Sequence, residues 1–308
     1  MALSPMADFT DLPFCRLVRE CSGSDVVIFR EMVAAEAIVR GNKRTDKICV
    51  LDPIERPVIQ QIFGSKPEVM AEAAVFIEKN HKPDGIDINM GCPVPKAVNQ
   101  YNGASLMKNP ERAQAIVSAV KSAINVPLSV KTRLGWSSAD NAHDFAKMLE
   151  QAGADAVELH GRTKVQGYSG VADWDAVGRA IKGLKIPALV NGDIVDAETA
   201  KIALSKSGAQ GFLIARGALG RPWIFKRIKQ TLETGTDPGD PELDERMAIM
   251  LKHAEYQVEV YGERGLIKLR KHLPWYFKGF DGFRQYRADA VKVATIEDVR
   301  RIAESITK

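Results

Sequence analysis

The stretch Gly85-Ile-Asp-Ile-Asn-Met-Gly-Cys-Pro93 is a short apolar strand that runs directly into a glycine turn carrying Asn89 and Cys92. Similar short runs rich in β-branched residues recur through the first two thirds of the chain. We predict eight strands, at residues 2–6, 25–30, 58–63, 85–90, 127–132, 156–160, 188–191 and 211–215. Eight is the number of strands that a (β/α)8 barrel requires.

Amphipathic stretches separate most of these strands and predict helices at residues 67–79, 110–124, 141–152, 173–181 and 197–206. Several begin with favourable start signals: Ser65 precedes Lys66-Pro67, Asn109 precedes a proline, and Asp196 precedes an alanine. The alternation of strand and helix indicates an α/β fold with parallel strands. An open doubly wound sheet is the alternative, but no GxGxxG motif follows the first strand, so we favour the TIM barrel.

The last quarter of the chain has a different character. Residues 234–241 form a Gly/Pro/Asp-rich linker, and residues 242–308 show helical periodicity without a clear strand pattern. Helices are expected at 244–260, 265–277, 283–293 and 296–306. We therefore predict a catalytic barrel over residues 1–233, the linker, and a small all-helical C-terminal domain over residues 242–308.

Composition places few limits on function. The 308 residues are 45% hydrophobic and 27% charged, and the net charge of +4 argues only weakly for an anionic partner. The four cysteines include no CxxC pair and no Cys/His cluster, so no metal is expected. Sparse cysteines, the lack of a signal-peptide pattern and the lack of an 18-residue apolar run predict a cytoplasmic protein with no membrane association. No obligate protein partner is evident.

Residues able to perform chemistry follow nearly every predicted strand. They are Met6, Glu31, Gln61, Asn89 with Cys92, Lys131 with Arg133, His160 with Arg162, Asn191, and Arg216. A lone histidine or cysteine is more often structural, and arginines at a barrel rim often form salt bridges. The joint pattern is harder to explain structurally, because the carboxyl ends of barrel strands surround one mouth.

Glycine turns follow the seventh and eighth strands, at Asn191-Gly192-Asp193 and Arg216-Gly217-Ala218. Barrels commonly bind phosphate at this place. Each turn alone could merely reverse the chain. With Arg216 available as a charged donor, we favour a phosphate site.

These motifs together resemble the tRNA-dihydrouridine synthase family, with the tail most similar to the bacterial B-type subgroup. The resemblance rests on Ser4-Pro5-Met6-Ala7-Asp8-Phe9-Thr10-Asp11, Gln61-Ile62-Phe63-Gly64-Ser65, Asp87-Ile88-Asn89-Met90-Gly91-Cys92-Pro93, Gly103-Ala104-Ser105-Leu106-Met107, Val130-Lys131-Thr132-Arg133, His160-Gly161-Arg162-Thr163, Asn191-Gly192-Asp193-Ile194, Arg216-Gly217-Ala218-Leu219-Gly220-Arg221-Pro222-Trp223 and His272-Leu273-Pro274-Trp275-Tyr276. The sequence departs from the family at three positions. Asp8 replaces a usual glycine, Cys15 a common arginine, and Ala215 the glycine of the last phosphate loop.

The resemblance implies an FMN-dependent oxidoreductase, a flavoprotein reduced by NADPH or NADH, that transfers hydride to C6 of a uridine in tRNA. Cys92 is then the catalytic proton donor to C5, because a thiol is largely protonated at neutral pH. Expected cofactor-binding residues are Pro5, Met6, Ala7, Gln61, Lys131, His160, Asn191, Gly192, Asp193, Ala215 and Arg216. Expected substrate-binding residues are Asn89, Arg133 and Arg162.

The tail carries basic residues interleaved with aromatic ones, such as Lys271, Trp275, Tyr276 and Lys278. This composition suits an RNA backbone and its bases, and the resemblance implies a tRNA-binding domain. Two alternatives stay open: an FMN-dependent dehydrogenase of a free pyrimidine, and an RNA-binding protein without catalysis.

Overall fold

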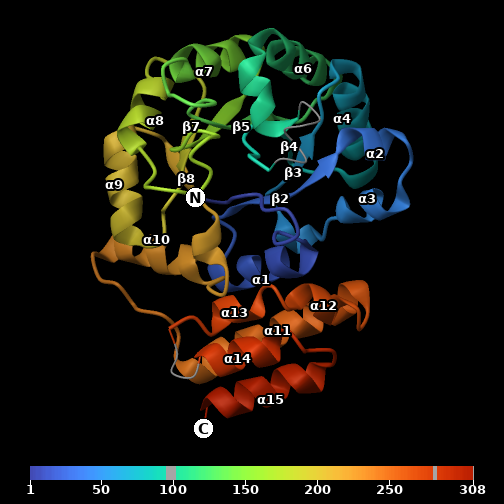
Figure 1. Cartoon of the computed structure of the whole chain (residues 1–308), viewed down its shortest axis with the longest axis vertical. Helices are drawn as coiled ribbons and strands as arrows, with labels where there is room; N and C mark the ends of the chain where they lie inside the picture. Colours follow the sequence, from blue (N-terminus) through green and yellow to red (C-terminus); the bar gives the residue numbers. More distant parts are fainter. Residues whose placement is uncertain (95–101, 280–282, 308) are drawn as a thin grey trace.

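The computed structural model describes residues 1–94, 102–279 and 283–307. Eight parallel strands close into one barrel in chain order, and a ring of helices surrounds them (Figure 1). The strands are β1 (Ala2–Leu3), β2 (Val27–Ala34), β3 (Val58–Phe63), β4 (Gly85–Asn89), β5 (Leu128–Arg133), β6 (Ala156–His160), β7 (Ala188–Asn191) and β8 (Gly211–Ile214). The predicted TIM barrel is confirmed, and the open sheet is excluded because β1 pairs with both β2 and β8.

The helices outside the barrel are α1 (Leu12–Ser22), α2 (Ala35–Val39), α3 (Lys43–Ile48), α4 (Pro67–His81), α6 (Pro110–Ala123), α7 (Ala142–Gln151), α8 (Trp174–Ile181), α9 (Ala197–Ser207) and α10 (Ile224–Thr234). The five helices predicted around the barrel, which are α4 and α6 to α9, lie close to their predicted bounds, whereas α1, α2, α3 and α10 were not predicted. The side chains of Asn109 and Asp196 cap α6 and α9 as expected. Ser65 does not cap α4. That helix begins at Pro67, so the cap position falls on Lys66, whose side chain has no oxygen to accept an amide hydrogen.

Two strands differ from prediction, and one difference shapes the site. β2 continues past residue 30 to Ala34, with a shift of register in its pairing with β3. β1 ends at Leu3, because the chain then folds into a turn. The Met6 amide donates to Thr10 Oγ1 at 3.0 Å, and the Thr10 amide donates to the Met6 carbonyl, also at 3.0 Å. This turn places the segment after β1 over the end of the barrel.

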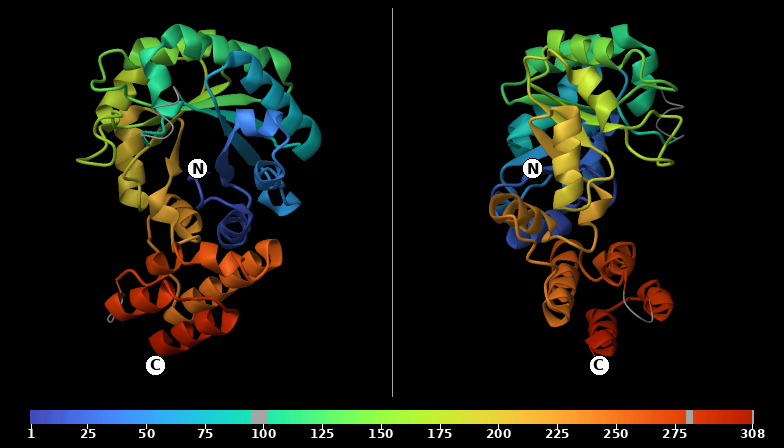
Figure 2. Two further views of the ribbon diagram at one scale, coloured as in Figure 1. Left: turned by 45° about the vertical axis from the view of Figure 1, so that its right-hand side comes forward. Right: turned by 90° about the vertical axis from the view of Figure 1, so that its left-hand side faces the viewer.

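The C-terminal helices gather at one end of the molecule in every view (Figure 2). They are α11 (Leu243–Tyr261), α12 (Gly265–Leu269), α13 (Leu273–Tyr276), α14 (Phe283–Ala290) and α15 (Ile296–Thr307). The single helix predicted over 265–277 is wrong, since it is split into α12 and α13. Pro274 explains the break, because it lacks an amide hydrogen and is tolerated only in the first turn of α13.

The C-terminal helices dock on α1. Their hydrophobic cluster includes Leu17 of that helix. Polar contacts reinforce the interface: Arg16 pairs with Glu259 at 2.9 Å, and the Tyr256 hydroxyl donates to Glu20 at 2.5 Å. The tail therefore holds a defined position beside the barrel. Among the described helices, none is both long and apolar enough to cross a membrane.

Candidate active site

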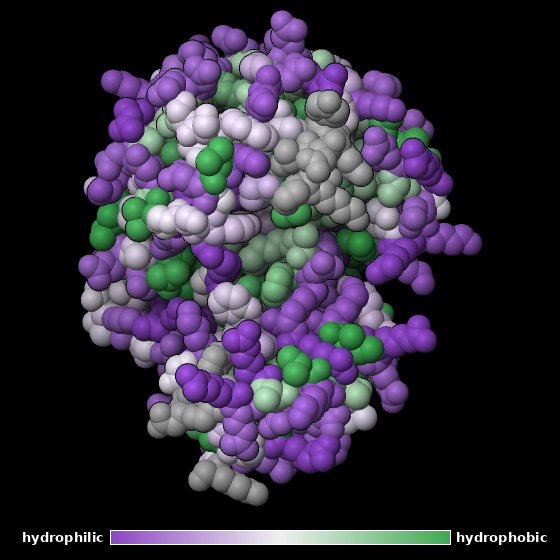
Figure 3. Space-filling view, in the orientation of Figure 1, coloured by the Kyte–Doolittle hydropathy of each residue, from purple (hydrophilic) through white to green (hydrophobic). Residues whose placement is uncertain are grey.

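The carboxyl ends of the strands surround a cavity of about 1040 Å³, at the upper end of the range for small-molecule sites. Hydrophobic residues are visible over the centre of this face, between polar surroundings (Figure 3). Predicted site residues that line the cavity are Pro5, Met6, Ala7, Gln61, Asn89, Cys92, Lys131, Arg133, His160, Asn191, Gly192, Asp193, Ala215 and Arg216. Two residues expected around the mouth lie outside the lining: Arg162, and Glu31, whose carboxylate accepts from the Asp8 amide.

The loop that carries Cys92 folds around the side chain of Asn89, the last residue of β4. Asn89 Oδ1 accepts hydrogen bonds from the backbone amides of Gly91, at 3.2 Å, and Cys92, at 2.9 Å. Its Nδ2 donates to Gln61 Oε1 at 2.8 Å. On the other side, a Cβ on Gly103 would lie 2.9 Å from the Cys92 carbonyl oxygen, so the close approach requires glycine. The thiol is thus held at the cavity wall by the barrel itself.

Two buried carboxyl groups lie beneath this loop. Gln61 Nε2 donates to Asp87 Oδ2 at 2.5 Å, and Ser129 Oγ donates to Asp87 Oδ1 at 2.7 Å. Burial raises the pKa of Asp87 to about 6. Burial, followed by repulsion from Asp87, raises the pKa of Glu158 well above its ordinary value. Both shifts favour retention of a proton by this pair of carboxyl groups, because burial disfavours charge and two carboxylates this close would repel each other.

Lys131 of β5 lies opposite Glu158 of β6 in the strand register, and its charge acts on both carboxyl groups. Its Nζ donates to Asn191 Oδ1 at 3.0 Å, and Asn191 Nδ2 donates to the Leu213 carbonyl at 2.9 Å. Burial, and secondarily the charge of Arg133, lower the pKa of Lys131 to about 8. The ammonium is therefore charged at pH 7 but poorly solvated, which favours an anionic ligand in the cavity.

The two arginines predicted to bind substrate mainly brace loops. Arg133 Nε donates to the Gly91 carbonyl at 2.7 Å, and its Nη1 donates to the Gly167 carbonyl at 2.8 Å. Arg162 is 2% exposed, and its guanidinium forms a two-pronged salt bridge with Asp193 at 3.0 and 2.6 Å. Arg162 thus forms the kind of structural salt bridge that is common at a barrel rim, which was the alternative interpretation of this residue. Its role toward substrate stays a prediction.

His160 is neutral in this setting. Burial, followed by the charge of Lys131, lowers its pKa well below the ordinary value. Its Nε2 lies 3.2 Å from Arg162 Nη1 and must accept that hydrogen bond, because a guanidinium only donates. A Cβ on Gly192 would lie 2.8 Å from the His160 ring, so the glycine turn after β7 closes tightly over the imidazole.

The predicted phosphate loops meet at the same mouth. The Asp193 carboxylate is engaged by Arg162 and lies 3.8 Å from Arg216. Any contact between Asp193 and a phosphate must therefore come from its backbone amide. Arg216 is 50% exposed at its side chain and faces the cavity. It is the better placed of these residues to attract an anion.

Sequence reasoning missed Tyr168. Its ring lies 5.4 Å from the Arg133 guanidinium and 4.9 Å from that of Arg216, and it lines the cavity. The loop that carries it has no periodicity to mark it. Trp275 and Lys278 also line the cavity, although they belong to the C-terminal region. Their basic and aromatic stretch indicated a binding role, but not that it reaches the barrel mouth.

A family model described as "Dihydrouridine synthase (Dus)" matches residues 2–307. The chain belongs to the dihydrouridine synthase family. This confirms the resemblance inferred from the motifs. Similar family members include "Probable tRNA-dihydrouridine synthase 1" of Synechocystis sp., 38% identical over 296 residues that cover 96% of this chain and 82% of the relative. Another is "tRNA-dihydrouridine synthase B" of Pseudomonas putida, 38% identical over 293 residues, with 94% and 85% covered.

Solved structures similar to this dihydrouridine synthase family member share its fold. A complex of 2-naphthoyl-CoA reductase matches with a TM-score of 0.56 at 11% identity, covering 75% of this chain and 50% of that one. Histamine dehydrogenase from a Rhizobium species matches with a TM-score of 0.56 at 13% identity, covering 83% and 48%. The chain spans about half of each of these proteins, and at such identities the likeness shows the fold alone.

The three departures from the family pattern have physical explanations. Asp8 has a φ of +65°, the region that favours glycine, and its amide is held by Glu31 Oε2 at 2.7 Å. Ala215 has a φ of −103°, so this position does not use the left-handed backbone that favours glycine, and its ψ of −104° belongs to neither the α nor the β region. Cys15 is fully buried in the main core, where it packs as a small apolar residue.

Proposed function

We propose that this family member is a tRNA-dihydrouridine synthase, which reduces a uracil ring in transfer RNA to its 5,6-dihydro form. The observation that carries the proposal is the placement of the Cys92 thiol. Asn89 holds it at the wall of a cavity that also contains the Lys131 ammonium. Relatives that are named tRNA-dihydrouridine synthases align with almost the whole chain.

The donor set of the cavity suits flavin mononucleotide. Lys131 offers a positive charge for the electron-rich edge of the ring system, and Arg216 offers one for the phosphate. Gln61 uses one amide hydrogen on Asp87 and one lone pair on Asn89, which leaves one of each for the ring. Held by Lys131, Gln61 and Arg216, the flavin would supply the hydride chemistry that links NADPH or NADH to C6 of the uracil.

The residues of this chain would hold the proton and position the base. Cys92 carries a proton at Sγ and delivers it to C5, from the face opposite the hydride. Asn89 reaches the cavity beside it, where its second amide hydrogen can pair with a uracil oxygen. Tyr168 lines the cavity close to the guanidinium groups of Arg133 and Arg216 and offers an aromatic ring that a base can contact.

Access for a whole tRNA requires that the target uridine leave its stack. Trp275 and Lys278 bring the C-terminal helices to the cavity, and Arg246 of α11 lines it as well. We infer that residues 242–308 are a tRNA-binding domain joined by the 234–241 linker to the barrel of residues 1–233. A cytoplasmic location follows from that substrate.

The decisive experiment compares Cys92→Ala with Cys21→Ala, a thiol of α1 outside the cavity lining. Both variants are expected to retain yellow bound flavin and its reduction by NADPH. Only Cys92→Ala should lose dihydrouridine formation. The measurement is mass spectrometry of tRNA from a strain that lacks the native gene and expresses the variant. Normal modification by Cys92→Ala would refute the proton-donor assignment.

Two rivals predict other results. A dehydrogenase of free pyrimidines would be insensitive to Lys278→Glu, whereas a tRNA enzyme should lose kcat/KM for tRNA and keep its NADPH oxidation. A point substitution is a more specific test than removal of residues 242–308. Removal would expose the part of α1 that α11 buries and could disturb the fold of the barrel. A non-catalytic RNA-binding protein would retain tRNA yet bind no flavin.

A further inference from the structure

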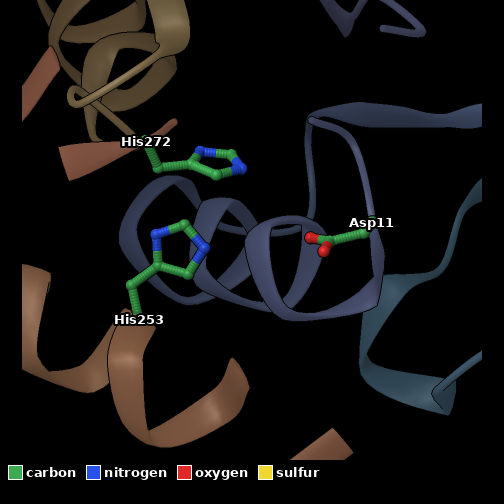
Figure 4. Close-up of side chains that lie close together, drawn as sticks. All are labelled: Asp11, His253 and His272. Carbon is green, nitrogen blue, oxygen red and sulfur yellow. The ribbon is translucent and has the colours of Figure 1, made fainter. Parts of the chain in front are cut away.

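Three residues far apart in the sequence converge where the C-terminal helices meet the barrel. Asp11 caps α1, His253 lies on α11, and His272 directly precedes α13. One ligand atom from each lies within 4.8 Å of the other two. Figure 4 shows the Asp11 carboxylate turned toward the two imidazole rings. All three side chains are buried, and none lines the active-site cavity.

His272 has no partner for either ring nitrogen, although both nitrogens are buried. Its neighbours are aromatic: the ring centroid lies 5.0 Å from that of Phe9, 5.1 Å from Phe14 and 4.6 Å from His253. Gln257 Oε1 is also buried without a partner. Unsatisfied polar atoms at such depth are rare and point to a missing ion or water.

His253 is oriented as a metal ligand commonly is. Its Nδ1 lies 3.0 Å from the Tyr276 hydroxyl. If Nδ1 carries the proton and donates to that hydroxyl, Nε2 presents a lone pair on the side of Asp11, where Gln257 Nε2 lies 3.5 Å away. A hydrogen bond on the other ring nitrogen is the usual device that fixes the tautomer of a ligating histidine.

The charges of the cluster also suit a cation. Asp11 forms no salt bridge within the described residues; its carboxylate accepts only from the Phe14 amide, at 3.2 Å, and Gln257 Nε2, at 3.0 Å. A buried carboxylate without a cationic partner is complemented by a metal ion that two imidazole nitrogens can also reach.

We propose that Asp11, His253 and His272 bind a divalent transition metal ion of the Zn²⁺ class. Two imidazole nitrogens and one carboxylate oxygen form a common ligand set for zinc. In a tetrahedral zinc site the ligand atoms lie about 3.4 Å apart, so the observed spread requires contraction by roughly 1 Å through side-chain rotation. The ion would join α1 of the barrel to α11 and to the start of α13.

Gln257 is suited to supply the fourth ligand. Its Nε2 now lies 3.0 Å from Asp11 Oδ2 and 3.5 Å from His253 Nε2, near the centre of the cluster. A half-turn of the amide exchanges nitrogen for oxygen at this place and gives Oε1 its missing partner. Without a metal, the same amide is a hydrogen-bond hub between Asp11 and His253, which is the competing explanation.

Equilibrium dialysis of the chelator-treated full chain against Zn²⁺ separates the two explanations. His272→Phe should bind one equivalent less than the wild type, and phenylalanine suits the aromatic surroundings. The matched control His143→Asn, on α7, should bind as the wild type does. Co²⁺ in place of Zn²⁺ should give the visible absorption of a four-coordinate site with nitrogen and oxygen ligands, absent in His272→Phe.

A second variant keeps the test decisive if His272→Phe fails to fold. Asp11→Asn retains a good cap for α1 but removes the negative charge, and should lower the affinity for Zn²⁺ at least tenfold. Equal metal content and affinity in the wild type, His272→Phe and Asp11→Asn would overturn the proposal, as would absence of binding by the wild type. Either result would support the hydrogen-bond hub.

Discussion

Replacement of Lys131 by methionine should change how the stability of the ligand-free protein depends on pH. Methionine has a similar length and no charge, so the variant removes a buried ammonium with little change of shape. Asn191 Oδ1 loses its donor, which costs about 1–3 kcal/mol at every pH. The stability gained by removing the buried charge depends on pH. A comparison of the variant with the wild type at two pH values therefore separates this gain from the constant cost of the lost hydrogen bond.

The magnitude follows from the shifted pKa. Burial lowers the pKa of Lys131 from 10.5 to about 8 in the folded protein. Below pH 8 the ammonium is charged in both states, and its burial costs about 3 kcal/mol, since one pKa unit corresponds to ~1.4 kcal/mol. Between pH 8 and 10.5 the unfolded chain binds more protons than the folded one, so wild-type stability rises with pH. By pH 10 the remaining cost is about 1 kcal/mol.

Urea unfolding followed by tryptophan fluorescence at pH 7 and pH 10 measures the effect. The free energy of unfolding of the wild type, relative to Lys131→Met, should rise by about 2 kcal/mol between these values. Lys79→Met, on the exposed side of α4, is the matched control and should track the wild type. If Lys131→Met tracked the wild type as well, the ammonium would not be desolvated. The same variant should bind FMN at least about tenfold more weakly.

Three further substitutions test other parts of the structure. Asn89→Ala should lose most dihydrouridine formation while retaining flavin, because the amides of Gly91 and Cys92 lose their acceptor. Asn89→Asp keeps that acceptor and should lose less activity. Equal activities of the two variants would contradict the role of Asn89 in shaping the loop. In urea unfolding, Asp8→Ala should lower the free energy of unfolding by about 1 kcal/mol and Asp8→Gly by less, because only glycine adopts the +65° φ freely. The reverse order would refute the importance of this φ angle. Glu55→Gln should cost about 3–5 kcal/mol, because it leaves the buried Arg30 guanidinium uncompensated, and Arg30→Met in the same chain should restore part of the loss.

The strands and their order could be predicted because local sequence carries both. The run 85–90 is buried on both faces, as a strand of a parallel barrel must be, and the alternation of Ile86 and Ile88 with polar residues marks it as a strand. Once eight such runs alternate with helices, barrel closure places their ends around one mouth. The membership of the cavity lining therefore followed from strand ends such as Gln61 and Lys131.

The features of the site that could not be predicted from the sequence depend on contacts across the barrel. Glu158 reads as an ordinary strand residue, and only closure of the barrel places its carboxyl group beside Asp87. Arg162 follows His160 like a substrate ligand, yet it turns away from the cavity to Asp193. The direction of a side chain depends on the partners that tertiary structure brings near it. The spacing of residues along the chain does not reveal those partners.

The segment after β1 joins the two features on which the proposals rest. Met6 and Ala7 line the cavity, and Asp11 lies in the cluster that contacts the C-terminal helices. The hydrogen bonds between Met6 and Thr10 make the intervening residues a single closed turn. Gln257 of α11 donates to Asp11 Oδ2 at 3.0 Å, so the C-terminal helices are bonded to the residue that follows this turn. The cavity wall and the docked tail therefore meet on one short segment of the chain, and the proposed metal ion would lie at that junction.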